Sequence, residues 1–118
     1  MSYKDLRVWE NSMDLVTEIY RITKKFPQYE LYGLTSQMRR AAISVPSNIA
    51  EGNGRGHTKE FVQFLFLARG SLMELMTQIE IAFRFEFLNE ETNEELKSKC
   101  KAINMMLHKL IKSIKAKL

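Results

Sequence analysis

Hydrophobic residues recur at intervals of three and four along most of the chain, which is the spacing of one face of an α-helix. No segment shows the strict alternation of a half-buried strand. Four helices are predicted, at Lys4–Lys25, from Thr35 into the glycine-rich segment 51–56, at Thr58–Phe87 and from about Asn89 onward. Because the connectors between them are short, we expect an all-α, up-and-down antiparallel four-helix bundle, with residues 1–118 as a single domain.

Capping residues and helix breakers suggest where these helices begin and end. Thr35 and Thr58 are suitable N-caps for the second and third helices, and Asn89 or Thr92 for the fourth. Pro46 falls inside the second pattern, so the helix should kink or begin again there. The glycines of segment 51–56 are expected to end that helix and turn the chain.

Two of the predicted helices carry more apolar surface than one side of a small bundle needs. The first has one apolar line at Leu6, Trp9, Met13, Val16 and Tyr20 and a second at Val8, Leu15, Ile19 and Ile22. The third adds a strip of Val62, Phe66 and Met73 beside its main core face. Self-association would cover such strips, and a wide core face within one subunit would cover them equally well.

Composition narrows the class of protein. Hydrophobic residues make up 45% of the 118 residues and charged residues 27%, which is typical of a globular domain and argues against disorder. No apolar run approaches the roughly 18 residues that a membrane span requires, and the first residues lack the apolar core of a signal peptide. Cys100 is alone, which excludes an intrachain disulfide and favours a reducing, cytoplasmic location.

Residues for catalysis or metal binding are sparse. His57 lies in the glycine-rich segment and His108 on the polar side of the fourth helix. Neither has a glutamate three residues before it, as a di-iron bundle would require, and neither is spaced with Asp, Glu or Cys as a metal site or catalytic triad would be. We therefore expect no enzyme activity, no metal and no cofactor, with both histidines on solvated surface.

Positive charge is the more informative feature. The net charge is +4, a mild bias toward anionic partners. On the fourth helix a band of about 80° collects Lys97, Lys101, Asn104, His108, Lys112 and Lys115. Such a stripe can follow a phosphate backbone without reading base sequence, although lysines also solvate any exposed helix.

Two further polar features allow more than one interpretation. The segment Gly52–His57 precedes a helix N-terminus, so with Arg55 and Lys59 it either holds an anion or is a flexible turn. The second helix carries a polar stripe made of Arg40, Ser44, Ser47 and Glu51, flanked by Gln37 and Asn48. This stripe is either a buried network that fixes helix register or a binding surface.

The stretch QMRRAAISVPSNIAEGNGR at 37–55 strongly resembles the central motif of the four-helix-bundle proteins called 23S rRNA-intervening sequence proteins. The resemblance extends to YKDLRVWENSMDLVTEIY, FPQYELYGLTSQ and ARGSLMELMTQIEIA, in the same order. It implies a bacterial four-helix bundle that assembles with itself, as related proteins do in barrel-like pentamers, and no enzymatic activity. A similar group serves diversity-generating retroelements, where a basic barrel is thought to engage nucleic acid.

The resulting hypothesis is a non-enzymatic homo-oligomer, a pentamer by resemblance, that binds RNA or DNA without sequence preference. Its candidate nucleic-acid-binding residues are Arg39, Arg40, Arg55, Lys59, Lys97, Lys101, Lys112 and Lys115. The polar residues of the family motif, as the resemblance places them, are Gln37, Ser47, Asn48, Glu51 and Gly52. The competing hypothesis is a scaffold or accessory subunit that recruits a partner protein through the second-helix polar face and the apolar strips.

Overall fold

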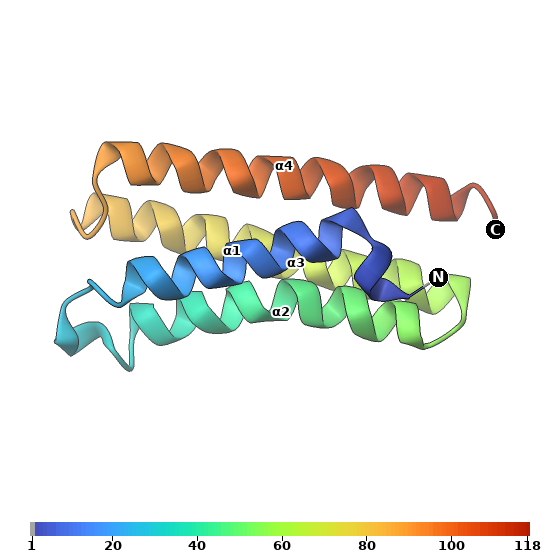
Figure 1. The fold of residues 1–118 in the computed structure, drawn as a ribbon, viewed down its shortest axis with the longest axis horizontal. Helices are drawn as coiled ribbons and strands as arrows, with labels where there is room; N and C mark the ends of the chain where they lie inside the picture. The colour runs from blue at the N-terminus through green and yellow to red at the C-terminus, as the bar shows by residue number, and fades with distance from the viewer. Residues whose placement is uncertain (1) are drawn as a thin grey trace.

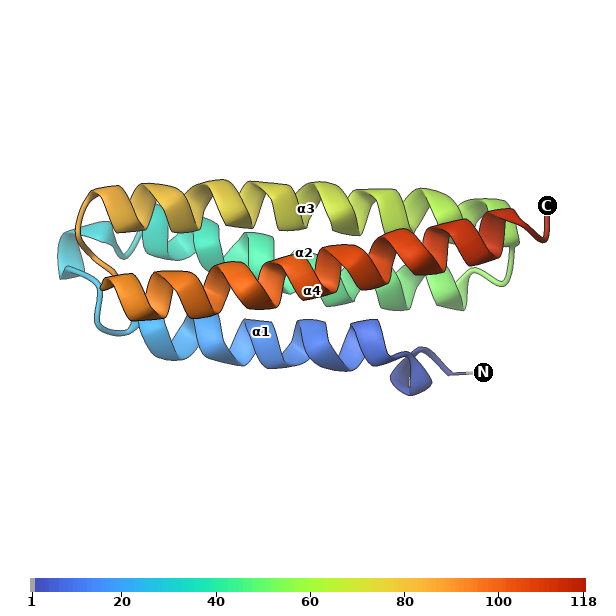
Figure 2. The same cartoon turned by 90° about the horizontal axis from the view of Figure 1, so that it is seen from above.

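Four long helices run antiparallel to one another in the computed structural model, which describes residues 2–118 apart from the side chain of Asp5. The elements are η1 (Tyr3–Asp5), α1 (Arg7–Thr23), η2 (Gln28–Glu30), α2 (Leu34–Gly54), α3 (Thr58–Arg84) and α4 (Glu90–Lys115). Each helix reverses the direction of the one before it (Figure 1), and the view from above shows the same alternation (Figure 2). The predicted all-α, up-and-down four-helix bundle is therefore confirmed.

The helices pack unequally around the core. α2 and α3 have the most extensive contact, whereas α1 and α4 have the least of the four neighbouring pairs. α2 and α4 lie diagonally opposite and do not pack against each other in the described chain. Cations on these two helices therefore face different sides of the bundle.

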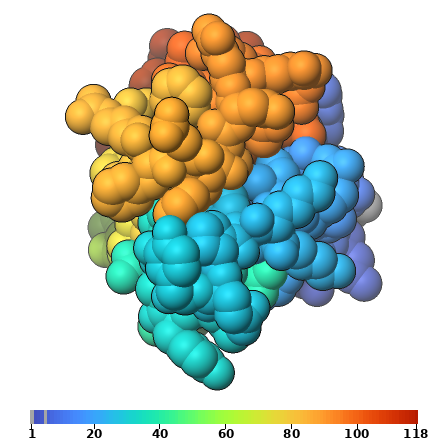
Figure 3. Space-filling model, turned by 90° about the vertical axis from the view of Figure 1, so that its left-hand side faces the viewer, coloured from blue at the N-terminus to red at the C-terminus, as the bar shows by residue number. Residues whose placement is uncertain are grey.

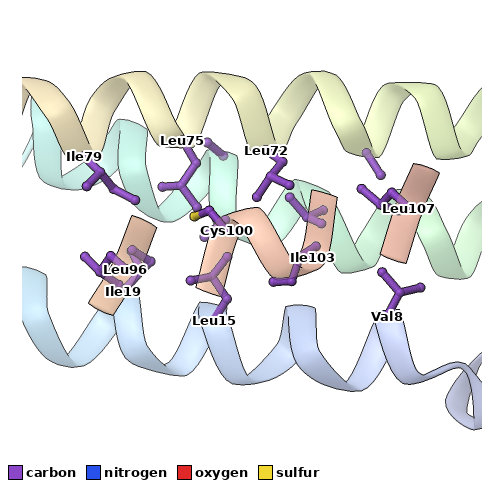
Figure 4. Packing of buried hydrophobic residues seen from close by; sticks show 14 of the residues in the cluster. Val8, Leu15, Ile19, Leu72, Leu75, Ile79, Leu96, Cys100, Ile103 and Leu107 are labelled. Carbon is purple, nitrogen blue, oxygen red and sulfur yellow. The ribbon is translucent and has the colours of Figure 1, made fainter. Parts of the chain in front are cut away.

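The core is built from the predicted core faces of all four helices. Val8, Leu15 and Ile19 point from α1 toward Leu72 and Leu75 of α3, and toward the α4 residues Leu96, Cys100, Ile103 and Leu107 (Figure 4). Burying each large aliphatic side chain contributes about 1.5–3 kcal/mol relative to leaving it exposed. The second apolar line of α1 is thus the one that enters the core.

The first apolar line of α1 and the strip on α3 stay partly at the surface. Trp9 and Val16 are half-buried, and Met13 is 40% exposed. On α3, Val62 is buried, but Phe66 is 42% exposed and Met73 38%. One subunit therefore covers only part of the surplus apolar surface.

Helix termini differ in detail from the predicted ones. Gly33, not Thr35, is the N-cap of α2, and the first N–H of the helix, that of Leu34, donates to Glu30 Oε1 at 3.0 Å. Thr35 is instead buried within the helix. His57, not Thr58, is the N-cap of α3, and neither Gly33 nor His57 makes a side-chain capping bond. The prediction for α4 is confirmed, since Asn89 Oδ1 accepts the N–H of Thr92 at 2.8 Å.

Pro46 and two of the three glycines lie inside a continuous α2. The helix does not begin again at Pro46, as one prediction allowed, and it continues through Gly52 to Gly54. The turn is therefore only residues 55–57, and of the three glycines only Gly56 has a positive φ, 75°. Gly52 is a packing residue, because a Cβ there would lie 2.5 Å from Phe64 Cβ on α3. Its small size lets α2 and α3 approach closely.

α3 ends at Arg84, three residues earlier than predicted, because the chain closes it with a left-handed residue. Glu86 has a φ of 64°, which brings the N–H of Phe87 to the carbonyl of Ala82 at 2.9 Å. Phe87 then packs on Phe26 with ring centroids 5.4 Å apart. The connections α1–α2 and α3–α4 lie side by side at this end of the bundle (Figure 3).

Candidate nucleic-acid interface

Arg39 ties α2 to α1. Its Nε–H donates to Thr23 Oγ1 at 2.9 Å, and its guanidinium carbon lies 4.5 Å from the centre of the Tyr20 ring. Thr23 Oγ1 itself donates to the Ile19 carbonyl at 2.6 Å, so the hydroxyl is held in place. The side chain of Arg39 is half-buried. Its charge is therefore engaged within the subunit.

Arg55 is occupied at the turn between α2 and α3. It pairs with Glu51 at 2.8 Å, lies 3.9 Å from a carboxylate oxygen of Glu60, and covers the Phe64 ring at 5.1 Å. The hydrogen bond to Glu51 is the main cause that raises the pKa of Arg55 above its ordinary value. Two carboxylates close by offset the positive charge that this turn would otherwise present to an anion.

Ser44 of the α2 polar stripe and the flanking residue Asn48 belong to a hydrogen-bond network that includes Ser71 on α3. Asn48 Nδ2 donates to the carbonyl of Ser44 at 2.8 Å and lies 3.0 Å from its hydroxyl oxygen. Ser71 on α3 donates its hydroxyl to Ser44 Oγ at 2.9 Å. Of these bonds, only the one between Ser71 and Ser44 joins α2 to α3, the helix pair with the most extensive contact, whereas the two Asn48 bonds lie within α2.

Other residues of the stripe and its flank face outward. Gln37, Arg40 and Ser47 are exposed, and no carboxylate among the described side chains lies within ion-pair distance of Arg40. Ser47 also borders a hollow of about 320 Å³ between α1 and α2. Its other lining residues are mostly apolar, namely Tyr3, Trp9, Met13, Val16, Ile43, Pro46 and Ala50.

The α4 stripe is confirmed as helical, and its members differ in their surroundings. Lys97 pairs with Glu80 on α3 at 3.4 Å. Lys101 and Lys112 are exposed and have no ion-pair partner among the described residues. Lys115 places its ammonium 5.2 Å from the centre of the Phe66 ring on α3. The charge of the stripe is thus most available toward the C-terminal half of α4.

That half of α4 and the facing part of α3 form a basic groove. Two adjoining hollows of about 270 Å³ each share Arg69 and His108 as walls. The residues that line this α3/α4 groove are Phe66, Arg69, Asn104, Met105, His108, Lys109, Ile111, Lys112 and Lys115. There is no acidic residue between 61 and 73 on α3 or between 97 and 118 on and after α4. Among the described side chains, no carboxylate forms an ion pair with the arginine or lysines that line this groove.

Arg69 and Lys109 belong to this groove and were not among the predicted site residues. Arg69 follows Phe66 by three positions and precedes Met73 by four, so it interrupts the extra apolar strip of α3. A single arginine inside an apolar strip is the signal that could have indicated it. Lys109 lies about 60° outside the band chosen on α4, and its long side chain still lines the groove.

Comparison with protein families then places the chain. The family model for the 23S rRNA-intervening sequence protein matches residues 4–109. The chain belongs to this family. The predicted resemblance is therefore confirmed over most of the sequence, including the segment 37–55 and the groove residues as far as Lys109.

A solved structure has the same fold. The chain superposes with a TM-score of 0.83 on a protein of unknown function from the S23 ribosomal protein family of Bacteroides thetaiotaomicron. The two sequences are 23% identical, and the match covers 89% of this chain and 95% of the other. No curated protein matches the sequence at a significant level. The likeness supports the bundle architecture.

In this member of the 23S rRNA-intervening sequence protein family, the other reactive side chains are not gathered into one site. The described residues contain no group of three or more His, Cys, Asp and Glu side chains placed to hold a metal ion. His57 is exposed at the start of α3, far along the chain from the groove residue His108. Burial raises the pKa of Cys100 to about 12, which keeps its thiol protonated. No helix among residues 2–118 is long and apolar enough to span a bilayer.

Proposed function

We propose that this family member is a non-enzymatic homo-oligomer that binds RNA or DNA through its basic surface, with little preference for base sequence. The observation that carries the proposal is the α3/α4 groove, where Arg69, Lys109, Lys112 and Lys115 have no ion-pair partner among the described side chains. Each lysine or arginine that meets a phosphate releases a condensed counterion. Contacts of this kind give affinity without sequence readout.

Self-association is supported by apolar surface that one subunit leaves open. The α1/α2 hollow is lined by Trp9, Met13, Val16 and Ile43, and Met13 and Ile43 are each 40% exposed. A contiguous apolar hollow of this kind favours contact with another protein surface. Assembly would also bring several basic grooves into one particle, which increases the avidity for a long polyanion.

Salt dependence tests the nucleic-acid part of the proposal. With about four groove cations in contact, the logarithm of affinity should fall with the logarithm of salt at a slope of about −3 to −4 per subunit. Affinity should then drop about a hundredfold between about 50 and 200 mM salt, measured by fluorescence anisotropy of a labelled oligonucleotide. Absence of binding at the lower salt, or affinity unchanged between the two, would refute the proposal.

Light scattering coupled to size-exclusion chromatography, with and without RNA, tests the assembly. A particle of several subunits that carries RNA is the expected result. A stable monomer at high protein concentration would contradict self-association.

The α2 outer surface favours a second candidate function, recruitment of a partner protein. Gln37, Arg40 and Ser47 are exposed on α2, and Ser47 borders the α1/α2 hollow. A protein partner held there would bind largely through apolar contact, so its capture should change little with salt. Retention of one protein partner at both salt concentrations, together with no retained nucleic acid, would favour this scaffold function.

A further inference from the structure

The α3/α4 groove combines positively charged walls with an accessible aromatic ring. Together these two features indicate the class of ligand more specifically than the charge does. Phe66 lines the groove between Arg69 and Lys115 and is 42% exposed. No other aromatic ring stacks on it within the described chain. Proteins that bind single-stranded nucleic acids join these same two features, a cationic groove and an aromatic stacking surface.

Lys115 lies over the face of the Phe66 ring. Its ammonium lies 5.2 Å from the ring centre, at a mostly exposed position near the end of α4. An exposed contact between a lysine and a phenylalanine is weak, and the lysine side chain is flexible. A nucleobase stacks more strongly on such a ring than an exposed ammonium binds to it. A base can therefore displace Lys115, and the freed ammonium remains within reach of the phosphates that flank that base.

We infer that the α3/α4 groove binds single-stranded polynucleotide, with a base stacked on Phe66 and the backbone phosphates held by Arg69, Lys112 and Lys115. This inference rests on the proposed function and specifies its substrate class. Bases of a duplex are already stacked inside the helix and cannot reach the ring, whereas those of a single strand can. The groove runs from Asn104 to Lys115 on α4, about 16 Å by helical rise, so it holds a short run of nucleotides.

The neighbouring residue Leu67 provides a matched control for the ring. Leu67 is 55% exposed and does not line the groove. The double variant F66L/L67F has the same composition and net charge as the natural chain but moves the ring one position around the helix, away from the groove. Leucine at position 66 keeps most of the apolar contact with the bundle, so the fold should be preserved.

Fluorescence anisotropy with labelled single strands of about 12 nucleotides, oligo-dT and oligo-rU, and with a duplex of equal length tests the inference. The natural chain should bind the single strands about tenfold more tightly than the duplex. The affinity of F66L/L67F for the single strands should be about tenfold lower than that of the natural chain, and its affinity for the duplex should be unchanged. F66W should bind the single strands at least as tightly as the natural chain, and its added tryptophan fluorescence should be quenched, unlike that of L67W.

Each outcome separates this inference from the proposed function. Equal binding of single strands by F66L/L67F and the natural chain, with salt-sensitive affinity retained, would overturn the stacking inference and leave the basic-surface proposal standing. Polyglutamate that competes as well as a single strand of equal charge would likewise overturn it, because the groove would then recognise charge alone. Absence of binding to every probe at low salt would refute both. Preference for oligo-dT or oligo-rU decides between DNA and RNA.

Discussion

Two regions of this bundle carry clustered cations, and they use them differently. In the motif segment, Gln37–Arg55, Arg39 is bound to Thr23 and Tyr20 and Arg55 to Glu51. In the α3/α4 groove, Arg69 and Lys112 have no ion-pair partner among the side chains that the structure describes. Two of the three arginines of the motif segment are therefore engaged within the subunit and Arg40 is exposed, while the surface best suited to an anionic ligand lies on α3 and α4.

The largest expected effect follows from reversing charge in the groove. K112E/K115E should weaken oligonucleotide binding at least about a hundredfold, because two phosphate contacts are lost and two repulsions are added. The matched control is K24E/K25E, the same charge change at exposed positions at the end of α1. Anisotropy titrations at one salt concentration provide the measurement.

Glutamate in the last turn of α4 also opposes the helix dipole, so fraying needs a separate check. K112Q/K115Q avoids that repulsion and should still weaken binding about tenfold with an unchanged melting temperature. Equal losses for the groove variants and K24E/K25E would show that only net charge matters and that the groove has no special role.

Gly52 tests the architectural side of the comparison. G52A should lower the free energy of unfolding by about 1–3 kcal/mol, since its Cβ would lie 2.5 Å from Phe64 Cβ and α2 would be pushed from α3. G54A is the control, because a Cβ at Gly54 meets nothing within 4 Å. Alanine there should be neutral or stabilising by less than about 1 kcal/mol. Urea unfolding measures both, and equal effects would remove the packing explanation for Gly52.

Arg39 and Arg40 are adjacent in the motif, but their substitution should affect the stability of the bundle differently. R39A should destabilise the bundle by about 1–2 kcal/mol, because the hydrogen bond to Thr23 and the contact with Tyr20 are both lost. R40A should change the free energy of unfolding by less than about 0.5 kcal/mol, since Arg40 is exposed. Thermal and urea unfolding of the pair gives the comparison. A larger loss in the free energy of unfolding for R40A than for R39A would contradict the assignment of Arg39 as the arginine that joins α2 to α1.

The fold could be predicted from the sequence because periodicity identifies helices and short connectors order them. Periodicity could not show which of the two apolar lines on α1 is buried in the core. Leu15 and Met13, one from each line, are both apolar residues at helical spacing. Two of the predicted N-caps, Thr35 and Thr58, were wrong, whereas Asn89 was confirmed. Thr35 and Thr58 have good capping side chains, but the positions were taken by Gly33 and His57, where the chain enters each helix from its connector.

The candidate site was harder to predict, because a charge becomes available or occupied only through its three-dimensional neighbours. Arg39 lies next to Arg40 in the sequence, yet only Arg39 meets Thr23, which is sixteen positions away. Arg69 joins the α4 lysines only because α3 and α4 are antiparallel neighbours. Gly52 belongs to a glycine-rich segment that predicted a turn. In the structure it lies inside α2 and packs against Phe64 of α3. Local spacing contains none of these contacts.

The smallest expected effect on oligonucleotide affinity concerns Lys97, the α4 stripe lysine that forms an ion pair with Glu80 on α3. Glu80 binds Arg84 at 2.9 Å and Lys97 at 3.4 Å, and these partners, Arg84 first, lower the pKa of the Glu80 carboxyl. E80Q frees Arg84 and Lys97, of which Lys97 belongs to the basic stripe of α4. Oligonucleotide affinity should therefore rise about twofold in anisotropy titrations.

Because the pKa of Glu80 is lowered, its carboxylate stays charged at and somewhat below the usual glutamate pKa of about 4.3. Its ion pairs therefore support the fold above that pH and are lost only as the pH falls through the lowered value. The advantage of E80Q should accordingly be constant between about pH 5 and 8. E74Q is the control, an equal charge change at an exposed glutamate of α3 with no ion-pair partner in the described chain. If E74Q raises affinity as much as E80Q, net charge decides binding, and the distinction between engaged and available cations fails.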